Sequence, residues 1–390
     1  MEETPTTDAL VDEALDLAEG LDHPLRYVQI NSFYNGSTGT IMRRLHGQLT
    51  EHGIDSYVFW GRRHETINDH ERCCATKLGY LSHGVRARLS GKAGFYSRSD
   101  TAKLLKRLDE IDPDVVHLHN IHGYYVNIEM LFEWLASHRC QVRWTLHDCW
   151  AFTGHCAHFT YVNCAQWKSH CACSEKCPQL KEYPKTFAGS GSCKWCYEKK
   201  RRIFTLVEPE RMTLITPSHW LEGLVNQSFL AEYPIEVRHN AIDKTIFKPT
   251  SSDFRERYGI GDRFMILGVA SPWTERKGLG DFMRLARELD HEKFAIVLVG
   301  LSDKQIKQLP GDIVGLMRTN STQELAGIYS TADVFFNPTV EDNFPTVNLE
   351  AEACGTPVVT YDTGGCSETI SLVGSRCVKS WRQLFASVNP

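Results

Sequence analysis

Two acidic residues, Asp342 and Glu350, are separated by seven residues in the segment TVEDNFPTVNLEAEACGTPVV. Asp342 falls in the loop after an apolar run, and Glu350 falls inside the helix that follows. Ionised carboxylates accept several hydrogen bonds from hydroxyl groups. Backbone N–H groups at the start of that helix, around Asn343, Phe344 and Thr346, can face an anion. The segment predicts a site for a ligand with hydroxyl groups and negative charge, and a helix with solvated acids is the alternative.

Positive charge for such a ligand is found upstream, in the segment GVASPWTERKGLGDF. Arg276 and Lys277 come just before a glycine and a predicted helix. Cations in that place can neutralise charge that develops on a departing phosphate. A solvated Lys-Arg pair at the start of a helix is the alternative interpretation.

Glycines and histidines mark the ends of predicted strands in the first half of the chain. Gly36 and Gly39 lie between a predicted strand and a predicted helix, so backbone N–H groups there can approach an anion. A tight turn would need glycine equally. His147 ends another predicted strand, and ligands of open parallel sheets bind at such ends. His119 ends a third strand, where a satisfied core histidine is the preferred interpretation.

The elements that position these residues alternate along the chain, with helical stretches between apolar strands. The predicted strands are 25–30, 56–61, 115–120, 142–147, 213–217, 264–270, 294–300, 333–338 and 357–361. This alternation is typical of α/β proteins with parallel sheets covered by helices on both faces. The pattern breaks at about 248–262 and then restarts. We therefore expect two Rossmann-like domains that face a central cleft, at 25–247 and 248–390, after an acidic N-terminal extension at 1–24.

The run EAEACGTPVV, the acid eight places before its Glu350, the Lys-Gly element at Lys277 and the strand-end His147 together resemble glycosyltransferase family 4. This family, of the bacterial polysaccharide-biosynthesis type, has the GT-B fold. The matching motifs run in order from Leu25 to Glu368. Asp342 stands where the family usually has glutamate, which leaves Glu341 as an alternative first acid. Ala270 replaces a frequent arginine of the family, a change for which Arg276 can compensate. Beyond Glu368 the pattern fades, so we expect a short or divergent C-terminus.

The resemblance implies a retaining glycosyltransferase that moves a hexose-type sugar from a UDP- or GDP-linked donor to a saccharide or lipid-linked acceptor, in surface polysaccharide biosynthesis. It assigns catalysis to His147, Lys277 and Asp342. It assigns donor binding to Gly36, Gly39, Arg276, Lys277, Asn343, Phe344, Thr346 and Glu350. No cofactor for catalysis is implied, because the leaving phosphate can itself help to deprotonate the acceptor. A catalytically idle nucleotide-sugar binding protein and a GT-B epimerase or phosphorylase are the alternatives.

Nine of the 14 cysteines lie between Cys140 and Cys196, mostly in an insert of the first domain that we place at 149–196. In a long chain without an export signal we expect reduced thiols. Thiolates bind zinc tetrahedrally, and the insert predicts a structural zinc at Cys156, Cys164, Cys171 and Cys177. Alternative ligands are Cys173, Cys193, Cys196, His155, His158 and His170. Plain buried or free thiols are the alternative to any metal.

The composition is that of an ordinary soluble globular protein, with 390 residues of which 42% are hydrophobic and 23% charged. No apolar run reaches the ~18 residues that a membrane span needs, and the acidic start lacks the pattern of a signal peptide. We expect a cytoplasmic protein. Its net charge of −5 argues against binding to nucleic acid. A basic stretch with aromatic residues predicts either solvated helix faces or peripheral contact with the inner face of the membrane; it comprises Arg86, Arg88, Lys92, Phe95, Tyr96, Arg98, Lys103, Lys106 and Arg107.

Overall fold

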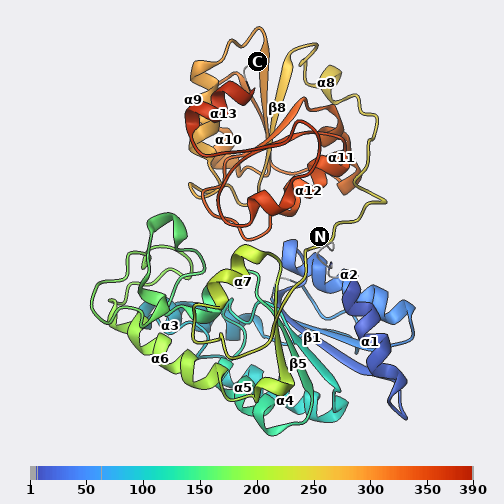
Figure 1. Ribbon diagram of the computed structural model, residues 1–390, viewed down its shortest axis with the longest axis vertical. Helices are drawn as coiled ribbons and strands as arrows, with labels where there is room; N and C mark the ends of the chain where they lie inside the picture. Colours follow the sequence, from blue (N-terminus) through green and yellow to red (C-terminus); the bar gives the residue numbers. More distant parts are fainter. Residues whose placement is uncertain (1–5, 7, 63, 389–390) are drawn as a thin grey trace. The chain divides into compact units, whose positions relative to one another are not determined.

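A computed structural model gives the fold and describes residue 6, residues 8–62 and residues 64–388. The chain divides into two compact units, Met1–Ala241 and Ile242–Pro390. Each unit is built on one β-sheet flanked by helices (Figure 1). All paired strands within the described residues run parallel. The prediction of two Rossmann-like α/β domains is confirmed.

The first unit has a seven-stranded sheet in the order β3-β2-β1-β4-β5-β6-β7. Its strands are β1 (Arg26–Phe33), β2 (Asp55–Arg62), β3 (Glu71–Cys73), β4 (Val115–Leu118), β5 (Gln141–Thr145), β6 (Met212–Thr216) and β7 (Ile235–Val237). Its helices are α1 (Ala9–Glu19), α2 (Ser37–Glu51), α3 (Lys77–Ser90), α4 (Arg98–Ile111), α5 (Ile128–Ser137), α6 (Gly191–Phe204) and α7 (His219–Val225). Four 3-10 helices complete it: η1 (Trp150–Phe152), η2 (Thr160–Val162), η3 (Gln166–Lys168) and η4 (Pro209–Arg211).

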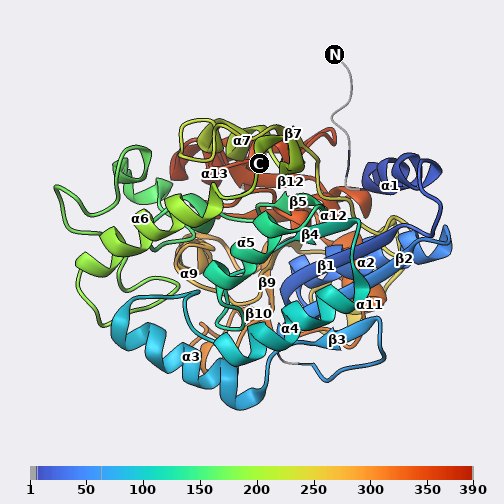
Figure 2. The same ribbon diagram turned by 90° about the horizontal axis from the view of Figure 1, so that it is seen from below.

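Strand β1 is covered on both faces. Val28 and Ile30 are fully buried on one face, in a cluster with Leu108 of α4 and several side chains of α5. Helices α4 and α5 lie side by side there (Figure 2). Tyr27 points to the opposite face and packs in a cluster with Leu49 of α2. Such burial favours apolar residues at successive positions, as in β9, although in β1 the buried face of Tyr27 also holds Gln29.

The acidic N-terminal segment contributes to this second face as a helix. Leu10, Val11 and Ala14 of α1 are buried in the same cluster as Leu49 of α2. Asp8, just before α1, accepts a hydrogen bond from Arg44 of α2 at 2.8 Å. Asp12, Asp16 and Glu19 of α1 are exposed, whereas Glu13 pairs with Arg143 and Arg238 of the first unit. The inner face of the helix thus belongs to the core of the first unit.

The second unit has a six-stranded sheet in the order β10-β9-β8-β11-β12-β13. Its strands are β8 (Phe264–Val269), β9 (Phe294–Val299), β10 (Ile313–Leu316), β11 (Val334–Asn337), β12 (Val358–Tyr361) and β13 (Arg376–Val378). Its helices are α8 (Phe254–Arg257), α9 (Leu279–Glu288), α10 (Asp303–Ile306), α11 (Thr322–Thr331), α12 (Thr346–Ala353) and α13 (Trp381–Val388), with the 3-10 helix η5 (Cys366–Thr369). The segment after Glu368, where the sequence pattern fades, thus adds a strand and a helix.

Helix α2 offers a paired test of its contact with the loop that precedes it. A Cβ on Gly39 would lie 2.3 Å from the carbonyl oxygen of Tyr34, whereas a Cβ on Gly47 of the same helix would meet nothing within 4 Å. We expect Gly39→Ala to lower the free energy of unfolding by about 1–3 kcal/mol, because the backbone must shift. Gly47→Ala should raise it by up to about 1 kcal/mol through helix propensity. Urea denaturation of both variants measures this, and equal effects would show that α2 does not pack against the loop.

Candidate active site

The second unit brings its predicted ligand groups together at the carboxyl ends of β8 and β11. Loop 270–278 follows β8, and loop 338–345 follows β11 and leads into α12. Gly278 joins the two loops: its φ is 75°, and a Cβ there would lie 2.3 Å from the carbonyl oxygen of Pro338. Only glycine tolerates this conformation at so close a contact. The basic pair Arg276 and Lys277 is thereby held against the acidic loop.

Asp342 is the one of the two candidate first acids whose carboxylate reaches solvent. Lys277 Nζ donates a hydrogen bond to Asp342 Oδ2, and both side chains remain partly exposed. The Glu341 side chain is completely buried, and its backbone oxygen accepts a hydrogen bond from the guanidinium of Arg276. A ligand at this loop therefore meets Asp342, Lys277 and the edge of Arg276.

Glu350 lies one helical turn into α12 with a partly exposed side chain. Tyr329 of α11 donates its hydroxyl hydrogen to Glu350 Oε2 at 3.1 Å. Burial raises the pKa of Glu350 to about 7, against the lowering effect of hydrogen bonds from Tyr329 and Thr346. A carboxylate poorly solvated in this way gains more from ligand hydroxyl groups than one already covered by water.

The start of α12 differs in one respect from the sequence interpretation. The backbone N–H of Asn343, predicted to face the donor's phosphates, donates to Asp342 Oδ1 at 2.9 Å. A loop carboxylate next to its own chain captures the nearest donor, as aspartates do in turns. Asn343 and Phe344 are buried at 5% exposure each, and their part in donor binding stays a prediction. Thr346 begins the helix and is partly exposed.

In the first unit, the predicted glycine loop lies between β1 and α2. Gly36 has a φ of 89° and directly precedes the helix, while Gly39 contacts the Tyr34 carbonyl. Both glycines therefore have a conformational or packing reason to be glycine. Asn31, at the end of β1, braces the loop, since its Nδ2 donates to Phe33 O at 3.0 Å and its Oδ1 accepts from Ser32 N at 2.9 Å.

Three histidines form a row at the carboxyl ends of β4 and β5. His119 Nδ1 lies 3.1 Å from His147 Nε2, and His119 Nε2 lies 3.1 Å from Gln29 Oε1. His117 stacks on His119 with ring centroids 4.3 Å apart. His119 is thus a buried, fully bonded histidine that orients His147. Burial lowers the pKa of His147 to about 4, so its ring is neutral at pH 7 and can donate or accept one hydrogen bond at each nitrogen.

A histidine–aspartate pair beside His147, formed by His122 and Asp148, was not predicted from the sequence. His122 Nε2 lies 2.9 Å from Asp148 Oδ2, and His122 Nδ1 lies 3.0 Å from the Tyr183 hydroxyl. Burial opposes ionisation of Asp148, but the charge and hydrogen bond of His122 prevail and hold the pKa of Asp148 below its usual range. Trp150 N also donates to Asp148, at 2.9 Å. The carboxylate is therefore ionised and fixed next to the candidate catalytic histidine.

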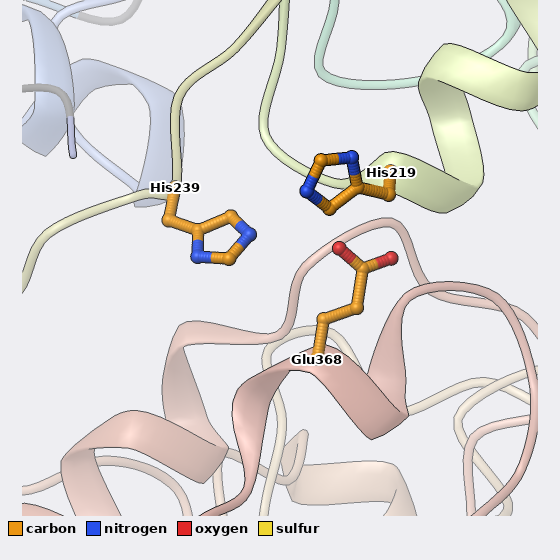
Figure 3. Close-up of side chains that lie close together, drawn as sticks. All are labelled: His219, His239 and Glu368. Atoms are coloured by element: carbon orange, nitrogen blue, oxygen red, sulfur yellow. The ribbon is translucent and has the colours of Figure 1, made fainter. Parts of the chain in front are cut away.

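Two further histidines follow β6 and β7 of the first unit (Figure 3). His219 begins α7, and its Nδ1 lies 3.0 Å from Glu222 Oε2. The ring of His239, just after β7, meets the ring of His219 edge-on at 6.1 Å. Figure 3 also labels Glu368, which belongs to η5 of the second unit. The sequence segments TPSHWL and VRHN contain these histidines, but residue type alone did not single them out.

The four predicted zinc ligands lie apart from these clusters, in the insert between β5 and α6. Cys156, Cys164, Cys171 and Cys177 line one small cavity there.

Comparison with known proteins bears on both units. Residues 263–381 match the family described as Glycosyl transferases group 1. WcaC of Escherichia coli (strain K12), named as a colanic acid biosynthesis glycosyl transferase, is 25% identical over 284 residues, which cover 68% of this chain. The chain spans 64% of that relative's length, just under two thirds.

Solved structures share the architecture at low identity. Sucrose-phosphate synthase from Thermosynechococcus elongatus superposes with a TM-score of 0.66 at 16% identity, covering 93% of this chain and 88% of its own. HepE of Anabaena, solved in complex with UDP-glucose, gives 0.55 at 14% identity, covering 94% and 89%.

The fold is therefore the GT-B fold, as the sequence predicts. The predicted resemblance to glycosyltransferases is also confirmed, and the match to group 1 covers the sheet, the basic loop and the acidic loop of the second unit.

The raised pKa of Glu350 predicts a pH dependence of stability. A carboxyl group whose folded-state pKa lies above its unfolded value keeps its proton in the folded chain, so stability falls as pH rises from the usual glutamate range through about 7. Glu350→Gln should remove this fall, so the variant gains stability relative to the parent between about pH 5 and about pH 8. Thermal unfolding across that range measures it. Glu292→Gln, at an exposed position, is the control, and parallel curves for Glu350→Gln and the parent would contradict the assignment.

Proposed function

We propose that this chain is a retaining glycosyltransferase that moves a hexose-type sugar from a UDP- or GDP-linked donor to a saccharide or lipid-linked acceptor. The observation that carries the proposal is the ion pair of Lys277 with Asp342 at the carboxyl ends of the parallel strands β8 and β11, followed by Glu350 in α12, all within the segment that matches group 1 glycosyltransferases. Ligands of such sheets bind at that edge. A cation, an accessible carboxylate and a poorly solvated carboxylate together suit a phosphorylated, hydroxyl-rich ligand.

Each group has a distinct task in the proposed reaction. Glu350 accepts hydrogen bonds from the ribose hydroxyl groups, and Asp342 accepts them from the transferred sugar. Lys277 and Arg276 stabilise the negative charge that grows on the diphosphate as the bond from the sugar's anomeric carbon to the phosphate oxygen breaks. The acceptor oxygen forms the new bond on the same face, and its proton passes to the leaving phosphate oxygen. His147, oriented by His119, contacts the donor sugar. We assign no step to a cofactor, because these two cations supply the positive charge.

The names of similar proteins support a nucleotide-sugar donor and a polysaccharide product. HepE of Anabaena was solved with UDP-glucose, and WcaC is named for colanic acid biosynthesis. We extend both to this chain as a proposal for its donor class and its place in surface polysaccharide assembly.

The charge of Lys277 matters most when the diphosphate departs, so its loss should affect turnover more than donor binding. We expect Lys277→Ala to lower turnover at saturating donor by at least about tenfold, with a smaller change in donor affinity. Release of nucleotide from a panel of UDP- and GDP-sugars, with and without saccharide acceptors, measures turnover, and calorimetry measures affinity. Lys304→Ala, on the exposed surface of α10, is the control.

Three outcomes of this assay would contradict the proposal. Wild-type turnover in Lys277→Ala would make Lys277 a surface charge. Donor binding without nucleotide release under any condition would favour an idle binding protein. Interconversion of free nucleotide sugars would favour an epimerase.

An exposed apolar surface on helix α3 of the first unit supports the proposal of a lipid-linked acceptor. Helix α3 exposes Leu78 (81%), Leu81 (47%), Val85 (55%) and Leu89 (67%), which recur at the spacing of one helix face. Arg86 and Arg88 are exposed and, at about 100° per residue, lie about 80° to either side of Leu78. An apolar stripe with flanking cations is the pattern of a helix that lies in the interface of an anionic membrane.

The rest of the basic stretch has other contacts. Phe95 packs edge-on against Trp195 at 4.8 Å, and Tyr96 lies under the guanidinium of Arg86 at 4.1 Å. Phe187, 85% exposed, adds apolar surface where its N–H donates to Arg88 O at 2.7 Å. Within the described residues no helix is long and apolar enough to span a membrane. We therefore propose peripheral attachment at the cytoplasmic face through α3.

Vesicle sedimentation tests this surface. We expect binding to vesicles with phosphatidylglycerol and not to pure phosphatidylcholine, with a loss of at least about tenfold in affinity for the double variant Leu81→Ser with Val85→Ser. Val373→Ser removes a still more exposed apolar side chain elsewhere and should leave binding unchanged. If the double variant binds as the parent does, α3 is not the attachment surface.

A further inference from the structure

The insert between β5 and α6 has little regular structure to hold it. Between Thr145 and Gly191 the described chain forms only the short 3-10 helices η1, η2 and η3, and it appears as the green loops beside α6 in Figure 1. Ordering a chain segment costs on the order of 1–2 kcal/mol per residue of backbone entropy. A segment of this length therefore needs a core of its own.

Part of that core is aromatic, since Phe152, Phe159 and Trp167 are buried together in the core cluster of the first unit. Next to them lies a small cavity with a sulfur-rich wall. Cys156, Cys164, Cys171, Cys177 and Cys193 all line it. We call the first four of these residues, Cys156, Cys164, Cys171 and Cys177, the thiol cluster.

Three of the other candidate ligands from the insert fall outside this wall. Cys173 is exposed to solvent. Cys196 donates to the carbonyl oxygen of Gly91 at 3.4 Å. His170 Nε2 lies 3.1 Å from Glu198 Oε1. Cys193 and His155 line the cavity beside the four predicted ligands.

A buried cation beside the cluster carries an independent signal. Lys200 of α6 is 1% exposed, and its Nζ donates to the carbonyl oxygens of Trp150 at 2.6 Å and Thr153 at 3.1 Å rather than to a carboxylate. An unpaired buried ammonium is costly. The groups near it that can carry negative charge are Cys196, Cys171, Cys156 and Asp148. Four thiolates around one Zn²⁺ have a net charge of −2, which would compensate Lys200.

Two polar groups at the cavity suit a metal–thiolate centre. Gly154 N already donates to Cys171 Sγ at 3.2 Å, the type of bond that stabilises a thiolate ligand. His155 is 3% exposed and lines the same wall, and its Nε2 has no hydrogen-bond partner.

We propose that the thiol cluster binds one structural zinc ion through Cys156, Cys164, Cys171 and Cys177. Zinc replaces the four S–H protons, which leave to solvent. No three described thiols of the cluster lie mutually within 4.8 Å, whereas zinc bonds of 2.3 Å bring neighbouring sulfurs to about 3.8 Å. Binding therefore contracts the cavity and tightens the insert.

The site connects to the candidate active site through the insert. Lys200 holds Trp150, whose N–H donates to Asp148, and Tyr183 of the insert bonds His122. A zinc-ordered insert thus fixes the His122–Asp148 pair beside His147. The metal has no part in sugar transfer itself.

Metal analysis and cobalt substitution test the proposal on the full chain. Protein from zinc-supplemented medium, purified without chelator, should hold near-stoichiometric zinc. Co²⁺ added to the metal-free protein should give thiolate-to-cobalt charge-transfer bands and the visible bands of a tetrahedral site. Cys164→Ser and Cys171→Ser should each lower zinc content at least about fivefold, whereas Cys73→Ser and Cys377→Ser, at partly buried thiols elsewhere, should keep it.

Two outcomes would contradict the proposed zinc site. The zinc site is contradicted if the protein holds no zinc and gives no cobalt bands. Thiol analysis would then find these cysteines as free thiols, or Cys177 and Cys193 joined in a disulfide. Zinc lost in His155→Gln but kept in one of the cluster's serine variants overturns the four-thiolate ligand set. Because cobalt binding is read on the parent chain, variants that fail to fold leave the test intact.

Discussion

Parallel strand pairing is the constraint on which the rest of this structure depends. Because all described pairs are parallel, each strand ends at the same edge of its sheet as its neighbours, and the loops from separate parts of the chain converge there. In the second unit this brings Lys277, 65 residues away in sequence, to Asp342. In the first unit it brings His119 to His147. The chemistry of both clusters follows from topology before any single contact is considered.

The sequence predicted the buried central strands of both sheets and missed the strands at the sheet edges. All nine predicted strands are present. The four others are β3, β7, β10 and β13, each of three or four residues and mostly half-buried. Strands covered on both faces must be continuously apolar, which is visible in sequence. Edge strands such as Glu71–Cys73 need no such pattern, so composition does not reveal them.

The candidate site divides in the same way. Asp342, Lys277 and Glu350 lie on local motifs with fixed spacing, so the sequence was sufficient to propose them as site residues. His122, Asp148 and Tyr183 become one group only because an irregular insert returns Tyr183 to the end of β4, and no periodicity encodes such a return. The sequence also did not predict that the backbone N–H of Asn343 donates a hydrogen bond to the carboxylate of the adjacent Asp342.

The ion pair between Lys277 and Asp342 bears on how such a site can favour the transition state over the ground state. In the free protein Asp342 neutralises Lys277 and holds it in place, so little side-chain freedom is lost when a ligand arrives. A diphosphate that is still bonded to its sugar carries less charge at the bridging oxygen than one that is leaving. The lysine is therefore drawn from Asp342 toward the phosphate most strongly as that bond breaks, and interactions that strengthen only then accelerate the reaction. In the proposed reaction, Asp342 is thus both the contact of the transferred sugar and the resting partner of the cation.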